Sequence, residues 1–229
     1  EYKNRNYTKA SQLYESALSL AEKEFTKESM QYAVILDGIA DCAEITKNFQ
    51  KAEREYLKVK SLYEKLLGKD HPTYQYCCNR LGQVYYAQEK YSQAESLLVE
   101  CKAILAKDKE SNEYTTTCEN LAKLYEKQGK YTQAETLYIE AKNIHEKQGG
   151  KEYTKYQLAC KKLATLYYTQ KQYSKAEPLV LELKNLTEKE SGKNNTSYTN
   201  FCNNLAEIYK NQGKYSQAEL LYFESKNIR

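Results

Sequence analysis

The sequence predicts an all-α protein, a solenoid of antiparallel helix pairs with about five and a half repeats and eleven helices. Three observations support this prediction. A motif in which alanine follows an aromatic residue by three positions recurs at intervals of 42, 42, 40, 42 and 42 residues. Apolar residues around each copy repeat with helical periodicity, and small residues recur where two helices would approach closely. The aromatic residues are Tyr7, Phe49, Tyr91, Tyr131, Tyr173 and Tyr215.

Each motif begins one of six predicted helices, here called B helices. In the fourth copy the apolar and small residues form one stripe of an α-helix. The same offsets hold from Tyr7 and from Tyr215, so residues 7–20 and 215–228 are predicted to be B helices. We expect Tyr131 and Ala134 to be buried where helix B meets its neighbour. The stripe consists of Ala134, Leu137, Tyr138, Ala141 and Ile144.

A second kind of helix, the A helix, precedes each of the last five B helices. Its clearest copy has Cys118, Leu121, Ala122 and Tyr125 on one helical face. Alanine or glycine beside the leucine would let two helix axes approach closely, so that stacked repeats bury both faces of each pair. The other clear copies are Cys78, Leu81, Gly82, Tyr85, then Cys160, Leu163, Ala164, Tyr167, then Cys202, Leu205, Ala206, Tyr209.

The turn from helix A to helix B contains glycine in two repeats, at Gly129 and Gly213. Glycine takes the left-handed conformation that ends a helix at little cost. Lys47, Glu89 and Lys171 hold this position elsewhere, where the same conformation costs more. The whole chain, 1–229, is interpreted as one array and as a fragment of a longer protein. Its parts are a partial repeat at 1–24 and the repeats 25–67, 68–107, 108–148, 149–190 and 191–229.

The overall composition excludes several partners. Charged residues make up 29% of the chain, and 35 basic against 31 acidic residues leave a net charge of only +4. This balance indicates neither a nucleic acid nor an anionic membrane as partner, and no apolar run approaches the ~20 residues that span a bilayer. Seven widely spaced cysteines, an odd number, predict free thiols in a reducing compartment, here the cytoplasm.

No residue pattern predicts catalysis, a metal site or a cofactor. His71 and His145 have no partner at catalytic or ligand spacing. The A-helix cysteines should lie about one helix-packing distance apart, ~10 Å, which is too far for a disulfide or a shared metal. Ser191-Gly192-Lys193 lacks the first glycine of a phosphate-binding loop. The protein is therefore predicted not to be an enzyme.

These repeated positions resemble the tetratricopeptide repeat family. The residues that match the family's small, aromatic and turn positions are Leu121, Ala122, Tyr125, Gly129, Tyr131, Ala134 and Tyr138. The 42-residue period is similar to the longer repeats of the kinesin light chain group. Segments 68–72 and 203–206 look like the signatures of that group. The resemblance implies a right-handed superhelix whose A helices line a concave groove, and a protein or peptide ligand in that groove.

In the family, the groove is lined by residues just before and after the leucine of helix A. Asparagine at such positions could hold an extended peptide backbone, because an amide is both donor and acceptor, and the basic residues could attract carboxylates. Asp37, Asp41 and Glu44 would lie at the other end. The alternative is an ordinary solvated face. The predicted peptide-binding residues are Asn79, Arg80, Gln83, Asn120, Lys123, Lys161, Lys162, Asn203 and Asn204.

Three functions are compatible with this pattern. The first is a non-catalytic scaffold that binds a protein or peptide, for example a cargo adaptor. The second is a sensor array that controls an attached effector, such as a CHAT-type protease, encoded outside this sequence. The third is end-to-end self-association, because a truncated array exposes an apolar face that other arrays cover with a polar cap.

Overall fold

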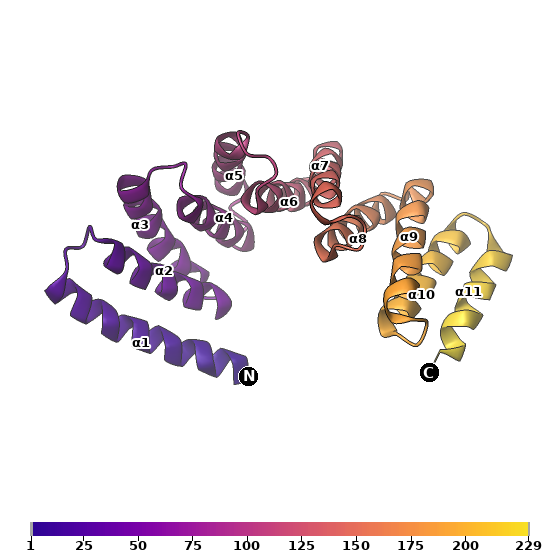
Figure 1. Ribbon diagram of the computed structural model, residues 1–229, viewed down its shortest axis with the longest axis horizontal. Helices are drawn as coiled ribbons and strands as arrows, with labels where there is room; N and C mark the ends of the chain where they lie inside the picture. Colours follow the sequence, from indigo (N-terminus) through magenta and orange to yellow (C-terminus); the bar gives the residue numbers. More distant parts are fainter. Residues whose placement is uncertain (1, 229) are drawn as a thin grey trace. The chain divides into compact units, whose positions relative to one another are not determined.

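The computed structural model describes residues 2–228, and these residues form eleven α-helices and no strand (Figure 1). This confirms the all-α helical-repeat solenoid. A helices have even numbers and B helices have odd numbers. The bounds are α1 (Tyr2–Glu24), α2 (Met30–Ile45), α3 (Phe49–Leu67), α4 (Pro72–Ala87), α5 (Tyr91–Leu105), α6 (Asn112–Lys127), α7 (Tyr131–Gly149), α8 (Thr154–Thr169), α9 (Tyr173–Ser191), α10 (Thr196–Asn211) and α11 (Tyr215–Asn227).

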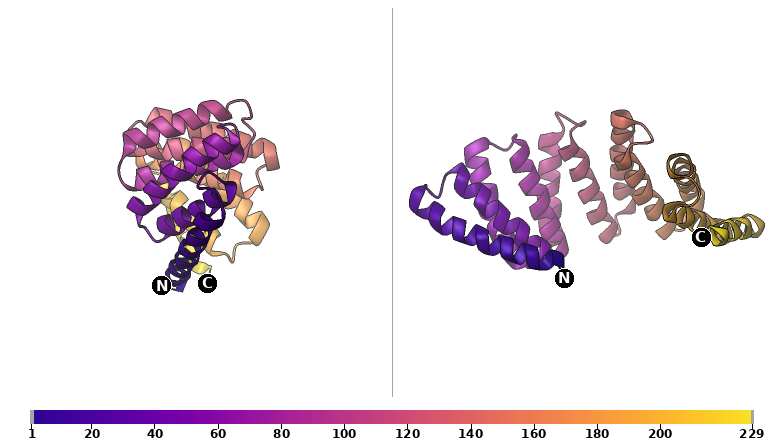
Figure 2. Two further views of the ribbon diagram at one scale, coloured as in Figure 1. Left: turned by 90° about the vertical axis from the view of Figure 1, so that its left-hand side faces the viewer. Right: turned by 60° about the horizontal axis from the view of Figure 1, so that its bottom comes forward.

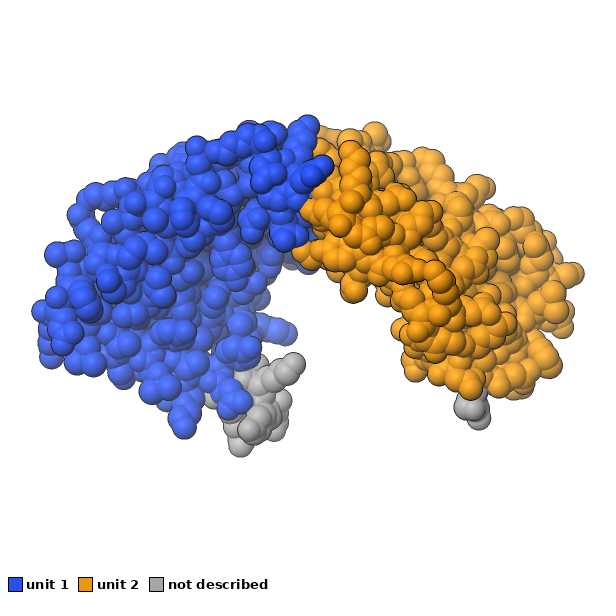
Figure 3. Space-filling view, viewed as in Figure 1, with its two compact units in different colours: residues 1–128 blue, residues 129–229 orange. Residues whose placement is uncertain are grey.

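The chain forms two compact units, residues 1–128 and 129–229, which Figure 3 distinguishes by colour. Within each unit, consecutive helices pack against each other and are joined by short loops (Figure 2). In unit 1 the A helix α4 also packs directly against the next A helix, α6.

The turns between A and B helices have the conformation that the sequence predicts. Gly129 and Gly213 have φ values of 71° and 77°, and Lys47, Glu89 and Lys171 have φ values of 60°, 60° and 58°. The left-handed conformation is therefore a property of the turn and not of glycine. The three non-glycine turns are the more strained.

The core consists of the repeated small residues together with the large residues beside them. Ala52, Ala94, Ala134 and Ala176 are completely buried, which confirms the prediction for Ala134. All seven cysteines are buried free thiols. They pack as small apolar residues.

The prediction that the aromatic residue at the start of helix B is buried is wrong. Tyr131 is 43% exposed and Tyr215 is 70% exposed. These rings lie at the end of a helix hairpin. The less exposed Tyr91 and Tyr173 contact a tyrosine of the preceding A helix, but the equivalent residues before Tyr131 and Tyr215 are Glu126 and Lys210. Tyr173, for example, contacts Tyr168 edge-on at 5.6 Å between ring centroids.

A contact between lysine and tyrosine joins B helices to the A helices that follow them. The lysine Nζ lies over the face of a buried tyrosine ring, where the negative ring quadrupole attracts it. The same two positions of the repeat are used each time, within unit 1 and within unit 2. The pairs and Nζ-to-centroid distances are Lys60–Tyr74 (5.4 Å), Lys102–Tyr114 (5.1 Å), Lys142–Tyr156 (5.2 Å) and Lys184–Tyr198 (4.8 Å).

Candidate functional site

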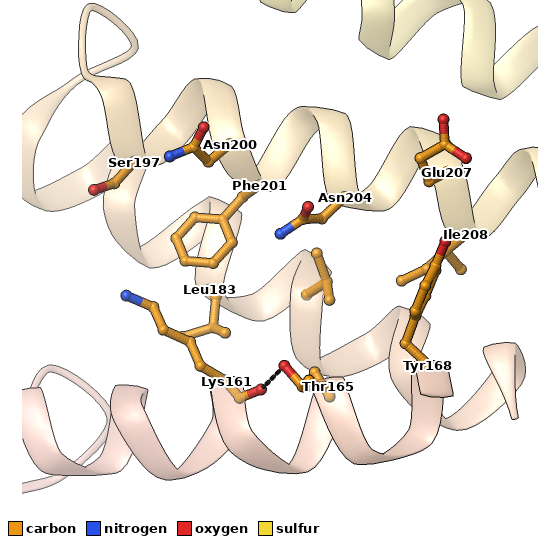
Figure 4. A pocket seen from close by; sticks show the side chains of 12 residues that line it. Lys161, Thr165, Tyr168, Leu183, Ser197, Asn200, Phe201, Asn204, Glu207 and Ile208 are labelled. Carbon is orange, nitrogen blue, oxygen red and sulfur yellow. Dashed lines mark hydrogen bonds between the residues drawn. The ribbon is translucent and has the colours of Figure 1, made fainter. Parts of the chain in front are cut away.

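A pocket of about 480 Å³ lies in unit 2 between the A helices α8 and α10, with the B helix α9 behind it in the view of Figure 4. This volume is within the usual range of ligand pockets, about 300 to 1,000 Å³. Its lining residues are Lys161, Ala164, Thr165 and Tyr168 from α8, Val180 and Leu183 from α9, and Ser197, Asn200, Phe201, Asn204, Glu207 and Ile208 from α10.

The pocket combines an apolar base with polar groups at its edge. Val180 and Leu183 are buried, and the Phe201 ring and the Asn204 amide point from α10 toward α8 (Figure 4). The exposed amides of Asn200 and Asn204 make no hydrogen bond within residues 2–228. Each amide can therefore donate to and accept from a ligand. The Thr165 hydroxyl instead donates to the Lys161 carbonyl oxygen at 2.9 Å.

The two charged residues of the pocket differ in their partners. Lys161 Nζ lies 5.2 Å from the Phe201 ring centroid, and among the described residues no carboxylate pairs with it. The Glu207 carboxylate accepts a hydrogen bond from the Tyr222 hydroxyl and lies 3.6 Å from Lys210 Nζ. The hydrogen bond from Tyr222 and the charge of Lys210 lower the pKa of Glu207 below its ordinary value. The charge still available to a ligand is the positive charge of Lys161.

The structure places Asn79 and Asn120 in a contact between helices, and the prediction that Asn79 faces a ligand is wrong. The Asn79 side chain is only 3% exposed. Its amide nitrogen donates to Thr117 Oγ1 at 2.9 Å and to the Gln75 carbonyl oxygen at 3.3 Å, and its oxygen accepts from Asn120 Nδ2 at 3.2 Å. The hydrogen-bonding capacity that suggested peptide binding is used to hold α4 against α6.

Arg80 does not offer a free charge to a ligand either. Its guanidinium lies 3.1 Å from Glu44 Oε2 and 3.4 Å from Asp41 Oδ1, and it donates to the Tyr56 hydroxyl at 3.4 Å. The placement of Asp41 and Glu44 at the far end of the groove is therefore wrong, because α3 packs against both α2 and α4 and these acids of α2 lie next to Arg80.

Asp37 belongs to the same part of unit 1. It accepts a hydrogen bond from the Tyr63 hydroxyl at 3.2 Å, while its buried Oδ1 has no partner within the described chain. Burial, followed by the nearby charge of Asp41, raises the pKa of Asp37 to about 6. Ionising this buried carboxyl costs free energy, so its charge should destabilise the folded protein at neutral pH.

Two of the nine predicted residues, Lys161 and Asn204, line the pocket. Lys162 and Asn203 are half-buried, lie next to them in the sequence and do not line it. In unit 1, Lys123 Nζ lies over the Tyr86 ring at 4.5 Å, and Gln83 is half-buried. These positions therefore have different environments in different repeats.

Sequence reasoning missed Asn200 and Phe201. Asn200 lies one helical turn before Asn204 on the same face, a spacing that could have indicated a paired amide site. Phe201 occupies a position where other A helices have smaller residues, including Thr117 and Ala159. A large aromatic residue at a position that is otherwise occupied by smaller residues could have indicated that this pair of helices packs differently.

The described residues offer little for other chemistry. No group of three or more histidine, cysteine, aspartate or glutamate side chains among residues 2–228 could hold a metal ion. Burial raises the pKa of Cys78 to about 12 and that of Cys101 to about 11, so these thiols stay protonated at neutral pH. None of the described helices combines the length and the apolar character needed to cross a bilayer.

Family models described as tetratricopeptide repeat match residues 37–107, 114–180 and 202–228. The chain belongs to the tetratricopeptide repeat family. The matched segments include the A helices α4 and α8, most of α6 and part of α10. None of the curated proteins compared matches the sequence of this tetratricopeptide repeat protein.

Solved structures with a similar fold include kinesin light chain-like repeat proteins. BtubC (BKLC) from P. vanneervenii is 22% identical, with a TM-score of 0.80 over 98% of this chain and 90% of that chain. A putative kinesin light chain from Podosopora anserina with nearly identical TPR-like repeats is 22% identical, with a TM-score of 0.75 over 84% of this chain and 92% of that chain. YrrB, described as a TPR protein with an unusual peptide-binding site, is 16% identical, with a TM-score of 0.59 over 93% and 92%. The predicted similarity to kinesin light chain-like repeats is confirmed at the level of the fold.

Proposed function

We propose that this tetratricopeptide repeat protein is a non-catalytic scaffold that binds an extended peptide segment of a partner protein in the pocket between α8 and α10. The observation that carries the proposal is the combination, in one pocket, of an apolar base, two amides without partners and a lysine without an acidic partner. YrrB, whose fold is similar, is described as having a peptide-binding site, which supports a peptide as ligand. Such binding would suit an adaptor or a sensor array, and the flanking sequence distinguishes the two.

The pocket chemistry defines the preferred peptide. Val180, Leu183 and Phe201 would surround an apolar side chain. The amides of Asn200 and Asn204 would bond the peptide backbone on either side of it, as an extended chain leaves its N–H and C=O groups unpaired. Lys161 would then face a carboxylate close to the apolar residue. The expected ligand is a segment with an acidic residue next to a large apolar one.

Two neighbouring lysines provide a matched test. We would measure, by fluorescence anisotropy, the Kd of labelled peptides that carry one large apolar residue flanked by glutamate or by lysine. Lys161→Glu should weaken binding of the acidic peptide by about ten-fold or more, equivalent to about 1.4 kcal/mol. Lys162→Glu makes the same charge change one residue away and outside the pocket lining, so it should have little effect.

Asn204→Ala and Asn203→Ala form a second matched pair, because only Asn204 lines the pocket. Asn204→Ala should weaken both peptides, since backbone bonds do not depend on peptide charge, while Asn203→Ala should not. Equal effects of the two lysine substitutions, or wild-type binding by Asn204→Ala, would remove this pocket as the ligand site. Failure of every peptide to bind would refute the proposed function.

A further inference from the structure

Two pairs of successive A helices, α4–α6 and α8–α10, occupy equivalent positions in the repeat but differ in structure. Equivalent positions can be counted from the shared leucines Leu81, Leu121, Leu163 and Leu205. The pair α4–α6 is in direct contact, whereas the pocket lies between α8 and α10. Each pair lies within one compact unit, so the difference arises from the residues between the two helices.

The first difference is at the position two residues before the leucine. Asn79 on α4 connects Thr117 and Asn120 on α6 by hydrogen bonds of 2.9 Å and 3.2 Å. On α8 the same position is Lys161, whose ammonium group instead lies over the Phe201 ring. The longer lysine side chain has no acceptor oxygen, so it cannot receive a bond from an asparagine of the next helix.

The second difference is at the position four residues before the leucine of the following helix. Thr117 is fully buried, and its hydroxyl lies 3.8 Å from Cys101 Sγ on the B helix α5. The equivalent of Thr117 is Phe201, whose ring is too large to let α10 settle against α8 as α6 does against α4. Three residues further along, both helices have asparagine. Asn120 is half-buried, whereas Asn204 is exposed.

The third difference is at the position two residues after the leucine. Lys123 on α6 lies over the Tyr86 ring of α4 at 4.5 Å and adds a second link between these helices. The equivalent pair is Tyr168 and Glu207. The face of an aromatic ring repels a carboxylate, and Glu207 instead accepts a hydrogen bond from Tyr222 on α11. This end of the α8–α10 pair therefore lacks the link as well.

We propose that these three positions decide which pair of A helices holds a ligand. Asn79, Thr117 and Lys123 close the α4–α6 pair, and Lys161, Phe201 and Glu207 keep the α8–α10 pair open. These residues are determinants of where the peptide binds, in addition to those that contact it. The inference rests on the proposed function for the identity of the ligand, an extended peptide with an acidic and an apolar residue, but the closure itself can be tested without a ligand.

The opening variant carries Asn79→Lys, Thr117→Phe and Lys123→Glu, the residues of the open pair. All seven cysteines are buried in the protein, so N-ethylmaleimide should modify them slowly. Opening the α4–α6 pair should expose Cys101, which lies under Thr117, and raise its modification rate by about ten-fold or more relative to the wild type, because such rates follow local opening. Mass spectrometry of peptides would assign the modified cysteine.

A control variant makes the same kinds of substitution on the same helices at positions that do not link them: Gln83→Lys, Thr116→Phe and Lys127→Glu. It should leave the Cys101 rate unchanged. A folded opening variant in which Cys101 reacts as slowly as in the wild type would overturn the inference. Rapid modification of all seven cysteines would mean that the opening variant is unfolded, and the closing variant then decides.

The closing variant carries Lys161→Asn, Phe201→Thr and Glu207→Lys, with a reporter cysteine at Ala164 in the pocket. The reporter should react at least about ten-fold more slowly than in the Ala164→Cys protein alone, and the variant without the reporter should lose peptide binding while keeping its helical circular dichroism. An unchanged reporter rate would overturn the inference. If the modification results hold but no peptide binds the wild type, the proposed function fails and the closure stands.

Discussion

A buried tyrosine hydroxyl of unit 1 lacks the hydrogen bond that its equivalent makes in unit 2. Tyr156 and Tyr74 occupy the same position of helix A, and each is 1% exposed. The Tyr156 hydroxyl donates to Glu182 Oε2 at 3.0 Å. The Tyr74 hydroxyl has no hydrogen-bond partner within the described chain. Glu100 holds the position of Glu182, and each of these carboxylates also pairs with a lysine, Lys69 or Lys151. Replacing each tyrosine by phenylalanine should therefore have different effects.

The expected magnitudes follow from what each hydroxyl contributes. A buried polar group without a partner costs about 1 to 3 kcal/mol, whereas a hydrogen bond to a charged acceptor contributes about 1.5 to 3 kcal/mol. Tyr74→Phe removes a group of the first kind and keeps the ring under Lys60, so it should be neutral or stabilise by up to about 1 kcal/mol. Tyr156→Phe removes a bond to a partly solvated carboxylate and should destabilise by about 1 to 2 kcal/mol.

Urea denaturation followed by circular dichroism would give the free energy of unfolding of each variant by linear extrapolation. Hydrogen exchange would localise the change, since the stability of a repeat array is a sum of local terms. We expect faster exchange in α8 of Tyr156→Phe and no increase in α4 of Tyr74→Phe. Equal destabilisation by the two substitutions would refute the argument from the missing hydrogen bond.

Three further predictions concern stability and association. Because the pKa of Asp37 is raised to about 6, the native state binds a proton that the unfolded chain has released, and this residue lowers stability as the pH rises from about 4 to about 6. Asp37→Asn should therefore increase the free energy of unfolding by up to about 3 kcal/mol at pH 7 but not at pH 4. Urea denaturation at both pH values would measure this difference. An equal effect of the substitution at the two pH values would contradict the prediction. A Cβ at Gly82 would lie 2.8 Å from Leu98 Cδ2, so Gly82→Ala should lower the free energy of unfolding by about 1 to 3 kcal/mol. In the double variant, Leu98→Val should recover most of this loss. No recovery would exclude this clash as the cause. Leu220 and Phe223 are 69% and 67% exposed, and we expect them to support self-association. Light scattering should then show a mass that rises with protein concentration and that falls when both residues are replaced by lysine. A wild-type protein that stays monomeric at every concentration would contradict this prediction.

The helices could be predicted from the sequence because their signals are local. A stripe such as Ala134, Leu137 and Ala141 repeats within one helix and requires burial of one face. The same holds for the turns, where Gly129 and Lys47 take one conformation because the hairpin requires it. The prediction that Tyr131 is buried was wrong, because burial of a residue at a helix end depends on the size of the side chain that the neighbouring helix has at that point.

The candidate site could be predicted only in part, because side-chain partners from distant repeats decide it. Asn120 and Asn204 occupy the same position with the same local pattern. Asn120 is half-buried because Asn79, on the previous A helix, accepts its hydrogen bond, whereas Asn204 faces the pocket beside Lys161. Arg80 is a similar case, since its acidic partners come from α2. No single-helix pattern contains this information.

The lysine-over-tyrosine contact between a B helix and the following A helix has the same chemistry at four junctions, from Lys60–Tyr74 to Lys184–Tyr198. A repeat with these two residues can follow any other repeat that has them. Loss or duplication of one repeat in the gene would thus leave complementary surfaces at the new junction. The number of repeats and the choice of ligand can therefore change independently during evolution, because this lysine and this tyrosine are not among the residues that open or close a pocket.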